Sequence, residues 1–304
     1  MENPKELRYF SKRLILLPLI WGGILLTHVL GLLLLPDTPA MWVGLSYLDY
    51  ATPNTPPAYL TIVVQPILEY CYNILHGDFG SSIFYQQPVL QIIYQALPIT
   101  VELSVKAFIV LYTLSVIIAW GKVQNRLFAK ALHFLCTQIS AVPSCLLYIL
   151  VFIASYYLSI ALSQYAQICA IAFLVIRRVA PLTTFIEHCL QRELQKPYII
   201  YARHRNVSEV RVWGSYLMKN ALIPVWIKAP KHLVQVIFTG TLSTEVLFGI
   251  DGFGQVSFLA MKHVDYPLVL ACLVLSSILL SMTHLAGDLL HKSLSPHIQI
   301  GKSR

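Results

Sequence analysis

Five ionisable side chains lie inside long apolar runs, where a charge is costly and therefore marks a functional site by default. They are Glu102, Lys106, Lys228, Lys231 and Glu245. Glu102 and Lys106 are four residues apart, so on a helix they share one face and can form an ion pair. Lys228 and Lys231 have two interpretations, because they either serve a polar site within the membrane or extend their long stems to the nearby membrane surface.

The sequence lacks the motifs that would make it an enzyme. It has neither H-E-x-x-H nor G-x-S-x-G, and its ten histidines are scattered without the spacing of metal ligands. Gly301, Lys302 and Ser303 share the ending of an ATP-binding P-loop, but Pro296 stands where that motif requires its first glycine. We therefore predict no catalytic residue, no metal site and no cofactor bound by this chain.

The composition points to lipid as the solvent. Of the 304 residues 57% are hydrophobic and 12% are charged, whereas charged residues make up about a quarter of a soluble domain. A transmembrane helix needs about 20 mainly apolar residues. Such runs predict an all-α membrane protein with six transmembrane helices: Leu14–Leu35, Leu97–Gly121, two within Ala131–Ile176 joined by the polar Ser163, Gln164 and Gln167, Ala221–Phe248 and Tyr266–Gly287.

Basic residues are concentrated in the segments on one side of the predicted membrane spans. Eighteen of the 22 Lys and Arg fall in the N-terminus, the 122–130 loop, the 177–219 segment and the C-terminal tail, and the opposite side has Lys262 alone. The long segment Pro36–Ala96 has four acids and no Lys or Arg. The positive-inside rule therefore places both termini in the cytoplasm and Pro36–Ala96 outside, and it explains the net charge of +8 without nucleic acid.

The cytoplasmic segment Arg177–Lys219 is longer than a connector requires. Its pattern predicts a hairpin, with a first helix that includes Leu190–Arg205 and a second that starts near the N-cap residue Ser208, with Glu209 in its first turn. Asn206 lies at the break, where asparagine favours the left-handed conformation that ends a helix. The hairpin carries too many apolar side chains for a solvated loop, so we expect it to lie on lipid or to enter a partner.

Ordered motifs resemble those of ABC importer permeases, specifically B-type subunits of the dipeptide/oligopeptide/nickel class. The run from Tyr198 to Asn206, followed by Asn220 to Pro224, is similar to the coupling (EAA) loop of that class, with Asn206 in place of the family glycine. Lys219, Asp251 and Ser295 also depart from the family pattern. The other matches are Asp78–Ser82 with Pro88–Val89, Leu97–Leu103, Glu245–Phe248 with Gly252–Gly254, Asp265–Pro267 and Asp288.

The resemblance implies a type I permease fold in a bacterial inner membrane. Residues 1–96 would hold the N-terminal tail, the first transmembrane helix and a large periplasmic loop; 97–291 the permease core, with a coupling loop at about 190–224; and 292–304 the cytoplasmic tail. ATPase-coupling residues would be Tyr198, Tyr201, Ala202, Arg203, Arg205, Asn206, Ser208, Glu209, Asn220 and Pro224. Candidates for a periplasmic gate or docking surface are Asp78, Phe79, Gly80, Phe248, Gly252, Gly254 and Asp265. The five ionisable residues in the apolar runs are candidates for the translocation path.

The resemblance also implies partners: a second, C-type permease, two ABC ATPase subunits that bind ATP and Mg, and a periplasmic or lipid-anchored solute-binding protein. The expected function is peptide import, with antimicrobial peptides, polyamines, nickel or haem as other substrates. A stand-alone ion-coupled secondary transporter or channel remains the main alternative, and a noncatalytic scaffold for a membrane complex is another. The outer segment 36–96 is either a cap on the helices or a docking surface.

Overall fold

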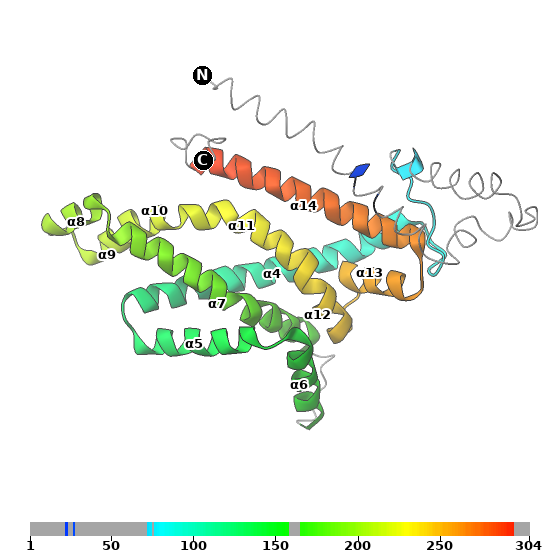
Figure 1. Cartoon of the computed structure of the whole chain (residues 1–304), viewed down its shortest axis with the longest axis horizontal. Coiled ribbons are helices and arrows are strands. Elements are labelled where there is room, and N and C mark those ends of the chain that lie inside the picture. The colour runs from blue at the N-terminus through cyan, green and yellow to red at the C-terminus, as the bar shows by residue number, and fades with distance from the viewer. Residues whose placement is uncertain (1–21, 24–26, 28–71, 75, 158–164, 295–304) are drawn as a thin grey trace, which may run out of the picture. The chain divides into compact units, whose positions relative to one another are not determined.

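The computed structural model describes residues 22–23, 27, 72–74, 76–157 and 165–294, and the regular elements of this part of the chain are helices (Figure 1). The described residues up to 96 form one compact unit with 256–281, and 97–255 form a second with 282–294. The predicted first span, Leu14–Leu35, falls almost wholly outside the described residues.

Helix α4 (Val89–Val123) contains the second predicted span and begins eight residues before Leu97. It ends in a turn with Asn125 in the left-handed conformation at φ 61°. The amide of Asn125 donates to the Lys122 carbonyl (2.9 Å) and that of Arg126 to the Gly121 carbonyl (3.0 Å), which satisfies the last carbonyls of the helix.

The third predicted span is broken rather than continuous. Helix α5 (Leu127–Ala141) and helix α6 (Ser144–Tyr157) flank an extended Val142 (φ −69°, ψ 134°). Pro143 explains the break, because proline disfavours a helical conformation in the residue before it. Helix α5 packs along α7, whereas α6 turns away (Figure 1).

Helix α7 (Ala166–Leu194) corrects two predictions. Gln167 lies within the helix instead of in a linker, and the helix continues for 18 residues beyond Ile176, where the charges of Arg177 and Arg178 ended the predicted span. Both arginines find main-chain acceptors: Arg177 donates to the carbonyls of Ser140 and Val142, and Arg178 donates to that of Gln235 (2.9 Å).

The predicted cytoplasmic hairpin consists of short segments. They are α8 (Pro197–His204), α9 (Glu209–Arg211), the π-helical η3 (Val212–Met218) and α10 (Lys219–Ala221). The prediction of one helix through Leu190–Arg205 was wrong, because α7 ends at Leu194 and Lys196 is extended (ψ 142°) before Pro197.

The fifth predicted span is a series of helices, α11 (Ile223–Gln235), the π-helical η4 (Val236–Gly240) and α12 (Thr241–Phe248). After a tight turn comes α13 (Phe253–Lys262), which lies between two of the predicted spans, and then α14 (Tyr266–Leu294) begins at the predicted residue.

Among the described residues, three helices are long and apolar enough to cross a membrane: α4, α7 and the Tyr266–Gly287 part of α14. The pair Ile223–Phe248 and Phe253–Lys262, bent by 75°, adds a fourth if it is counted as one span. The structure therefore supports a polytopic helical membrane protein, and the number of six spans stays a prediction.

A buried core joins the base of the hairpin to the long helices of the second unit. Side chains of α7, α8 and η3 are fully buried in one cluster, and each such aliphatic side chain contributes about 1.5–3 kcal/mol of burial free energy. Its fully buried members include Ile186, Leu190, Ile199, Val212 and Leu217.

Candidate functional site

The hairpin turns at Asn206. This residue has a φ of 54°, which confirms the predicted left-handed conformation. Its amide donates to the Arg203 carbonyl (3.0 Å), and the Val207 amide donates to the Ala202 carbonyl (3.2 Å). These two bonds form a Schellman motif, so asparagine takes the place that glycine usually holds at such a helix end.

Ser208 precedes α9 at the N-cap position, as predicted, but its side chain forms no capping hydrogen bond. Glu209 instead braces the turn. Its carboxylate accepts bonds from the Arg203 guanidinium (3.1 and 3.2 Å) and from the Trp213 indole N–H (3.1 Å). One acidic side chain thus links α8 to η3.

A second polar cluster ties the hairpin to the end of α7. The Tyr198 hydroxyl donates to the buried Glu193 carboxylate and accepts from the Asn220 amide (3.0 Å). Lys196 pairs with the same carboxylate at 2.8 Å. Burial, and then the hydrogen bond to Glu193, raise the pKa of Tyr198 above its ordinary value. Two predicted site residues 22 positions apart, Tyr198 and Asn220, therefore meet directly.

The opposite face of the hairpin is open. Ile199 and Ala202 are buried, whereas Tyr201 is 62% exposed and Val210 is 84% exposed. The Arg205 guanidinium lies 5.5 Å from the centre of the Tyr201 ring, within cation–π range. The hairpin therefore has one face packed on its own chain and one apolar and basic face without a partner in the described structure. Pro224 lies in the first turn of α11.

Glu245 lies at the centre of a buried hydrogen-bond cluster at the other end of the broken span. Its carboxylate accepts from the Thr100 hydroxyl (2.7 Å) and from the amides of Gly254 (2.7 Å) and Gln255 (3.3 Å), while the Phe253 amide donates to the Thr100 hydroxyl (2.7 Å). The first turn of α13 is thereby capped by groups from α4 and α12. Glu245 is thus buried and fully engaged with the turn, and its place in the translocation path stays a prediction.

The first compact unit holds a related cluster. Buried Asp265 accepts from the Ser82 hydroxyl, from the Phe84 amide (3.2 Å) and from the Leu268 amide (3.4 Å) at the start of α14. Phe84 also stacks on His263, with ring centres 3.9 Å apart. Asp78 accepts from the Gly80 amide (2.9 Å), so it forms a local turn of its own.

The other predicted gate residues, Phe79 and Phe248, are half-buried and buried respectively. Thr100 and Ser82 belong to the hydrogen-bond clusters but were absent from the predicted site residues. Their signal in the sequence was membership of the same short motifs as Glu102 and Asp78.

Of the charges in the apolar runs, Glu102 and Lys106 form the predicted ion pair at 2.5 Å, and both side chains are substantially exposed. Lys228 places its ammonium group 3.7 Å from the centre of the Phe185 ring of α7. Lys231 is exposed three residues further along α11.

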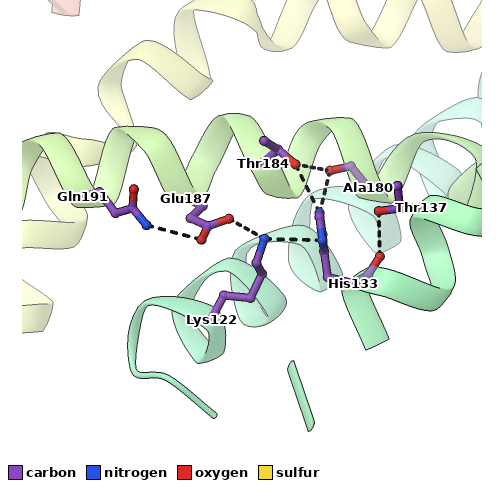
Figure 2. A network of polar contacts seen from close by, with 7 residues as sticks. All are labelled: Lys122, His133, Thr137, Ala180, Thr184, Glu187 and Gln191. Atoms are coloured by element: carbon purple, nitrogen blue, oxygen red, sulfur yellow. Dashed lines mark hydrogen bonds and ion pairs between the residues drawn. The ribbon is translucent and has the colours of Figure 1, made fainter. Parts of the chain in front are cut away.

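A polar network that the sequence analysis missed connects the α4–α5 turn to α7 (Figure 2). Lys122 pairs with Glu187 and lies 3.3 Å from Nδ1 of His133, and Gln191 donates to Glu187 (3.3 Å). Nε2 of His133 lies 3.1 Å from the Thr184 hydroxyl. The Lys122 and Glu187 side chains are only 14% and 17% exposed, so this ion pair is largely removed from water.

These features define a class: an integral membrane protein with several apolar helices and an amphipathic hairpin projecting from α7 and α11. Comparison with known families makes the class specific. The chain belongs to the family described as binding-protein-dependent transport system inner membrane component, whose sequence model matches residues 111–299. It is therefore a transporter permease component and not itself an enzyme.

Individual relatives agree with this family. The chain is 24% identical to the dipeptide transport system permease protein DppB of Lactococcus lactis subsp. cremoris, over 96% of this chain and 99% of the relative. It is 25% identical to the peptidoglycan transport system permease protein YejB of Agrobacterium fabrum, over 76% and 70%. It is 24% identical to the inner membrane ABC transporter permease protein YejB of Escherichia coli O157:H7, over 75% and 69%. These matches confirm the resemblance to ABC peptide-importer permeases.

Proposed function

We propose that this chain is the permease subunit of an ATP-driven importer of peptides, possessing six transmembrane helices and cytoplasmic termini. The support for peptides is that relatives matched over most of their length are named as dipeptide or peptide transport permeases. Antimicrobial peptides are a narrower substrate class within this proposal. The support for the orientation is the bias of Lys and Arg toward one side of the membrane.

The exposed face of the hairpin carries the proposal for energy coupling. Tyr201 and Val210 expose apolar surface at the tip of an element whose inner face is fixed by Glu193, Glu209 and the buried core. Exposed apolar patches of this kind mark protein interfaces. In this proposal a separate ATPase subunit covers the tip, and its rigid-body closure on ATP moves α7 and α11 to open the path to alternate sides.

The complete transporter would contain this chain, a second permease, two ATPase subunits and a solute-binding protein that docks on the outer surface. ATP and Mg would bind to the ATPases. In this arrangement the hairpin is the place where chemical energy enters the permease, and the hydrogen bonds that tie its base to α7 transmit the movement.

The test is co-purification and ATP-dependent peptide uptake with the tagged chain expressed beside its partners. Tyr201→Ala and Val210→Asp should release the ATPases and abolish uptake while the chain stays in the membrane. Ala202→Glu and Asn206→Glu should uncouple ATP hydrolysis from uptake. Tyr94→Ala is the matched control, since Tyr94 is also exposed (80%) but lies near the start of α4.

Two outcomes would overturn the proposal. Normal ATPase binding and uptake in the Tyr201 and Val210 variants would remove the coupling role of the hairpin. Peptide uptake by the chain alone in liposomes, driven by an ion gradient without ATPases or ATP, would establish the rival function of a secondary transporter.

A further inference from the structure

Helices α7 and α11 present a row of cations on adjoining faces. On α7, Arg178, Phe185, His188 and Arg192 recur at helical spacing, which places them on one side of the helix. On α11, Lys228 and Lys231 share a side in the same way. We call Arg178, Arg192, Lys228 and Lys231 the cationic face; His188 lies on the same side of α7.

Contacts show that the two rows adjoin. The Lys228 ammonium group lies over the Phe185 ring, 3.7 Å from its centre. The Arg178 guanidinium donates to the Gln235 carbonyl at the end of α11 (2.9 Å). Arg178, Lys228 and Lys231 all lie within electrostatic range of His232, and Arg192 and Lys228 within range of Cys189. The face is therefore one continuous surface of the second compact unit.

The positive charge of this face is not balanced locally. Among the described residues, Arg192, Lys228 and Lys231 have no carboxylate partner. The nearby acids are engaged elsewhere, because Glu187 pairs with Lys122 and the buried Glu193 pairs with Lys196. His188, Arg192, Lys228 and Lys231 are exposed.

Neither the acyl chains nor the headgroups of lipids can cover the whole of this face. Charged side chains in membrane spans face the bundle interior or water rather than acyl chains. From Arg178 to Arg192 the face extends for 14 residues of α7, or about 21 Å at the rise of an α-helix. That length exceeds the headgroup layer, since the polar zone accounts for only about 5–8 Å on each side of the hydrocarbon core. Lipid headgroups therefore cannot reach both ends of the row.

We infer that the cationic face lines the cytoplasmic end of the translocation path, on the side where the bias of Lys and Arg places residues 177–219, and that it binds the carboxylate groups of the transported substrate. This inference rests on the proposed function and specifies its substrate class as peptides with acidic side chains. Partly exposed Lys and Arg side chains attract such groups along the row. Because water reaches the face, each contact stays weak enough for release.

The test compares uptake of two peptides by the complete transporter, an alanine-rich peptide containing two glutamates and its analogue containing two glutamines. The variants are Lys231→Gln, Arg192→Gln and Lys228→Gln, with Lys228→Arg as the conservative change. Lys130→Gln is the matched control, because Lys130 is an exposed cation on α5 away from the face. The binding protein is the same in every assay. A change in the ratio of the two uptake rates between variants therefore comes from the permease.

Each neutral substitution on the cationic face should lower the ratio of glutamate-peptide to glutamine-peptide uptake by about two- to fivefold, the range expected for an exposed ion pair. Lys228→Arg and Lys130→Gln should leave the ratio unchanged. An equal loss of uptake for both peptides, or an unchanged ratio of uptake rates in all the variants, would overturn the inference.

Two further outcomes separate the possible failures. If the variants lose the second permease on co-purification, and neutralising an acid of that permease restores assembly, the face is a subunit interface and the inference is wrong. If the wild-type transporter imports no member of a di- to hexapeptide library with ATP, the proposed function itself fails. Import by the wild type without any preference for acidic peptides overturns only the inference.

Discussion

Gly252 and Glu245 approach each other so closely that a Cβ atom at position 252 would overlap the nearest carboxylate oxygen. The glycine therefore provides the space that lets the carboxylate reach the amides of Gly254 and Gln255. The sequence pattern of two glycines around Phe253 thus has a specific physical cause, which is the close approach of a buried acidic side chain to the turn.

We predict that Gly252→Ala destabilises the chain by about 1–3 kcal/mol, the usual cost of overpacking a well-packed site. The thermal midpoint of the detergent-purified protein measures this loss. Gly214→Ala is the control, because a Cβ at position 214 meets nothing within 4 Å. If the two variants are equally stable, the Gly252–Glu245 contact does not constrain the turn.

The Lys122–Glu187 pair should be worth much more than the Glu102–Lys106 pair. Removing one partner of a buried ion pair costs about 3–5 kcal/mol, whereas an exposed pair contributes about 0–1 kcal/mol. Lys122 and Glu187 are less than 20% exposed, and Glu102 and Lys106 are 63% and 48% exposed. We therefore expect Lys122→Met to be clearly destabilising and Lys106→Met to be nearly neutral.

A double-mutant cycle measures the coupling directly. Glu187→Met should recover part of the stability lost in Lys122→Met, because it removes the unpaired buried charge. Additive losses in Lys122→Met and Glu187→Met would show that the network of Figure 2 does not hold the α4–α5 turn to α7.

Ionisation of Tyr198 should destabilise the base of the hairpin at high pH. Its pKa in the folded chain is raised, first by burial and then by Glu193. A group with a raised folded pKa stabilises the structure below its unfolded pKa, about 10 for tyrosine, and loses that contribution as the pH rises through the folded value. Intrinsic amide exchange accelerates with pH in every segment. We expect exchange in the 197–220 hairpin to rise more steeply than this intrinsic rate only above about pH 10.

Tyr198→Phe provides the contrast. It removes the hydroxyl that links Glu193 to Asn220, so the hairpin should exchange faster already at neutral pH and show no further alkaline transition of its own. An identical pH profile in the wild type and in Tyr198→Phe would assign the transition to another group.

Among the described residues, Asn125, Asn206 and Val264 follow helix ends in the left-handed region without being glycine, and the last two make a useful comparison. Val264 ends α13 with a φ of 56°, and Asn206 ends α8 with a φ of 54°. This conformation is costly for a β-branched side chain and mild for asparagine. Val264→Gly should therefore stabilise the protein by about 1 kcal/mol and Asn206→Gly by less. Chemical denaturation ranks the two changes, and a larger gain at Asn206 would contradict this account.

Local rules predicted the features that depend on neighbouring residues. The left-handed Asn206, the pairing of Glu102 with Lys106 and the start of α14 at Tyr266 all follow from residue type and short spacing. The residue pattern of 177–219 also predicted the hairpin, and the family motifs added its expected role in coupling. Each of these features depends on contacts between residues close in the chain, which is the information that a single sequence contains most directly.

The errors arose where distant contacts override local preference. Arg177 ended the predicted fourth span because a charge in a membrane helix is costly, yet its guanidinium donates to the Ser140 carbonyl, 37 residues away. The role of Thr100 depends on Glu245, 145 residues away. No local pattern gives the position of such a partner, so the extent of α7 and the buried clusters required the structure.

Helix α7 has 29 residues, and an uninterrupted α-helix of that size is about 43 Å long. Its final turn bears the hairpin, and its middle bears Arg177 and Arg178. If the parts on either side of Pro181 move together, a tilt of about 10° would displace one end by roughly 7 Å over this length. A small rotation at the hairpin end of α7 would then become a displacement of several ångströms at the other end of the helix.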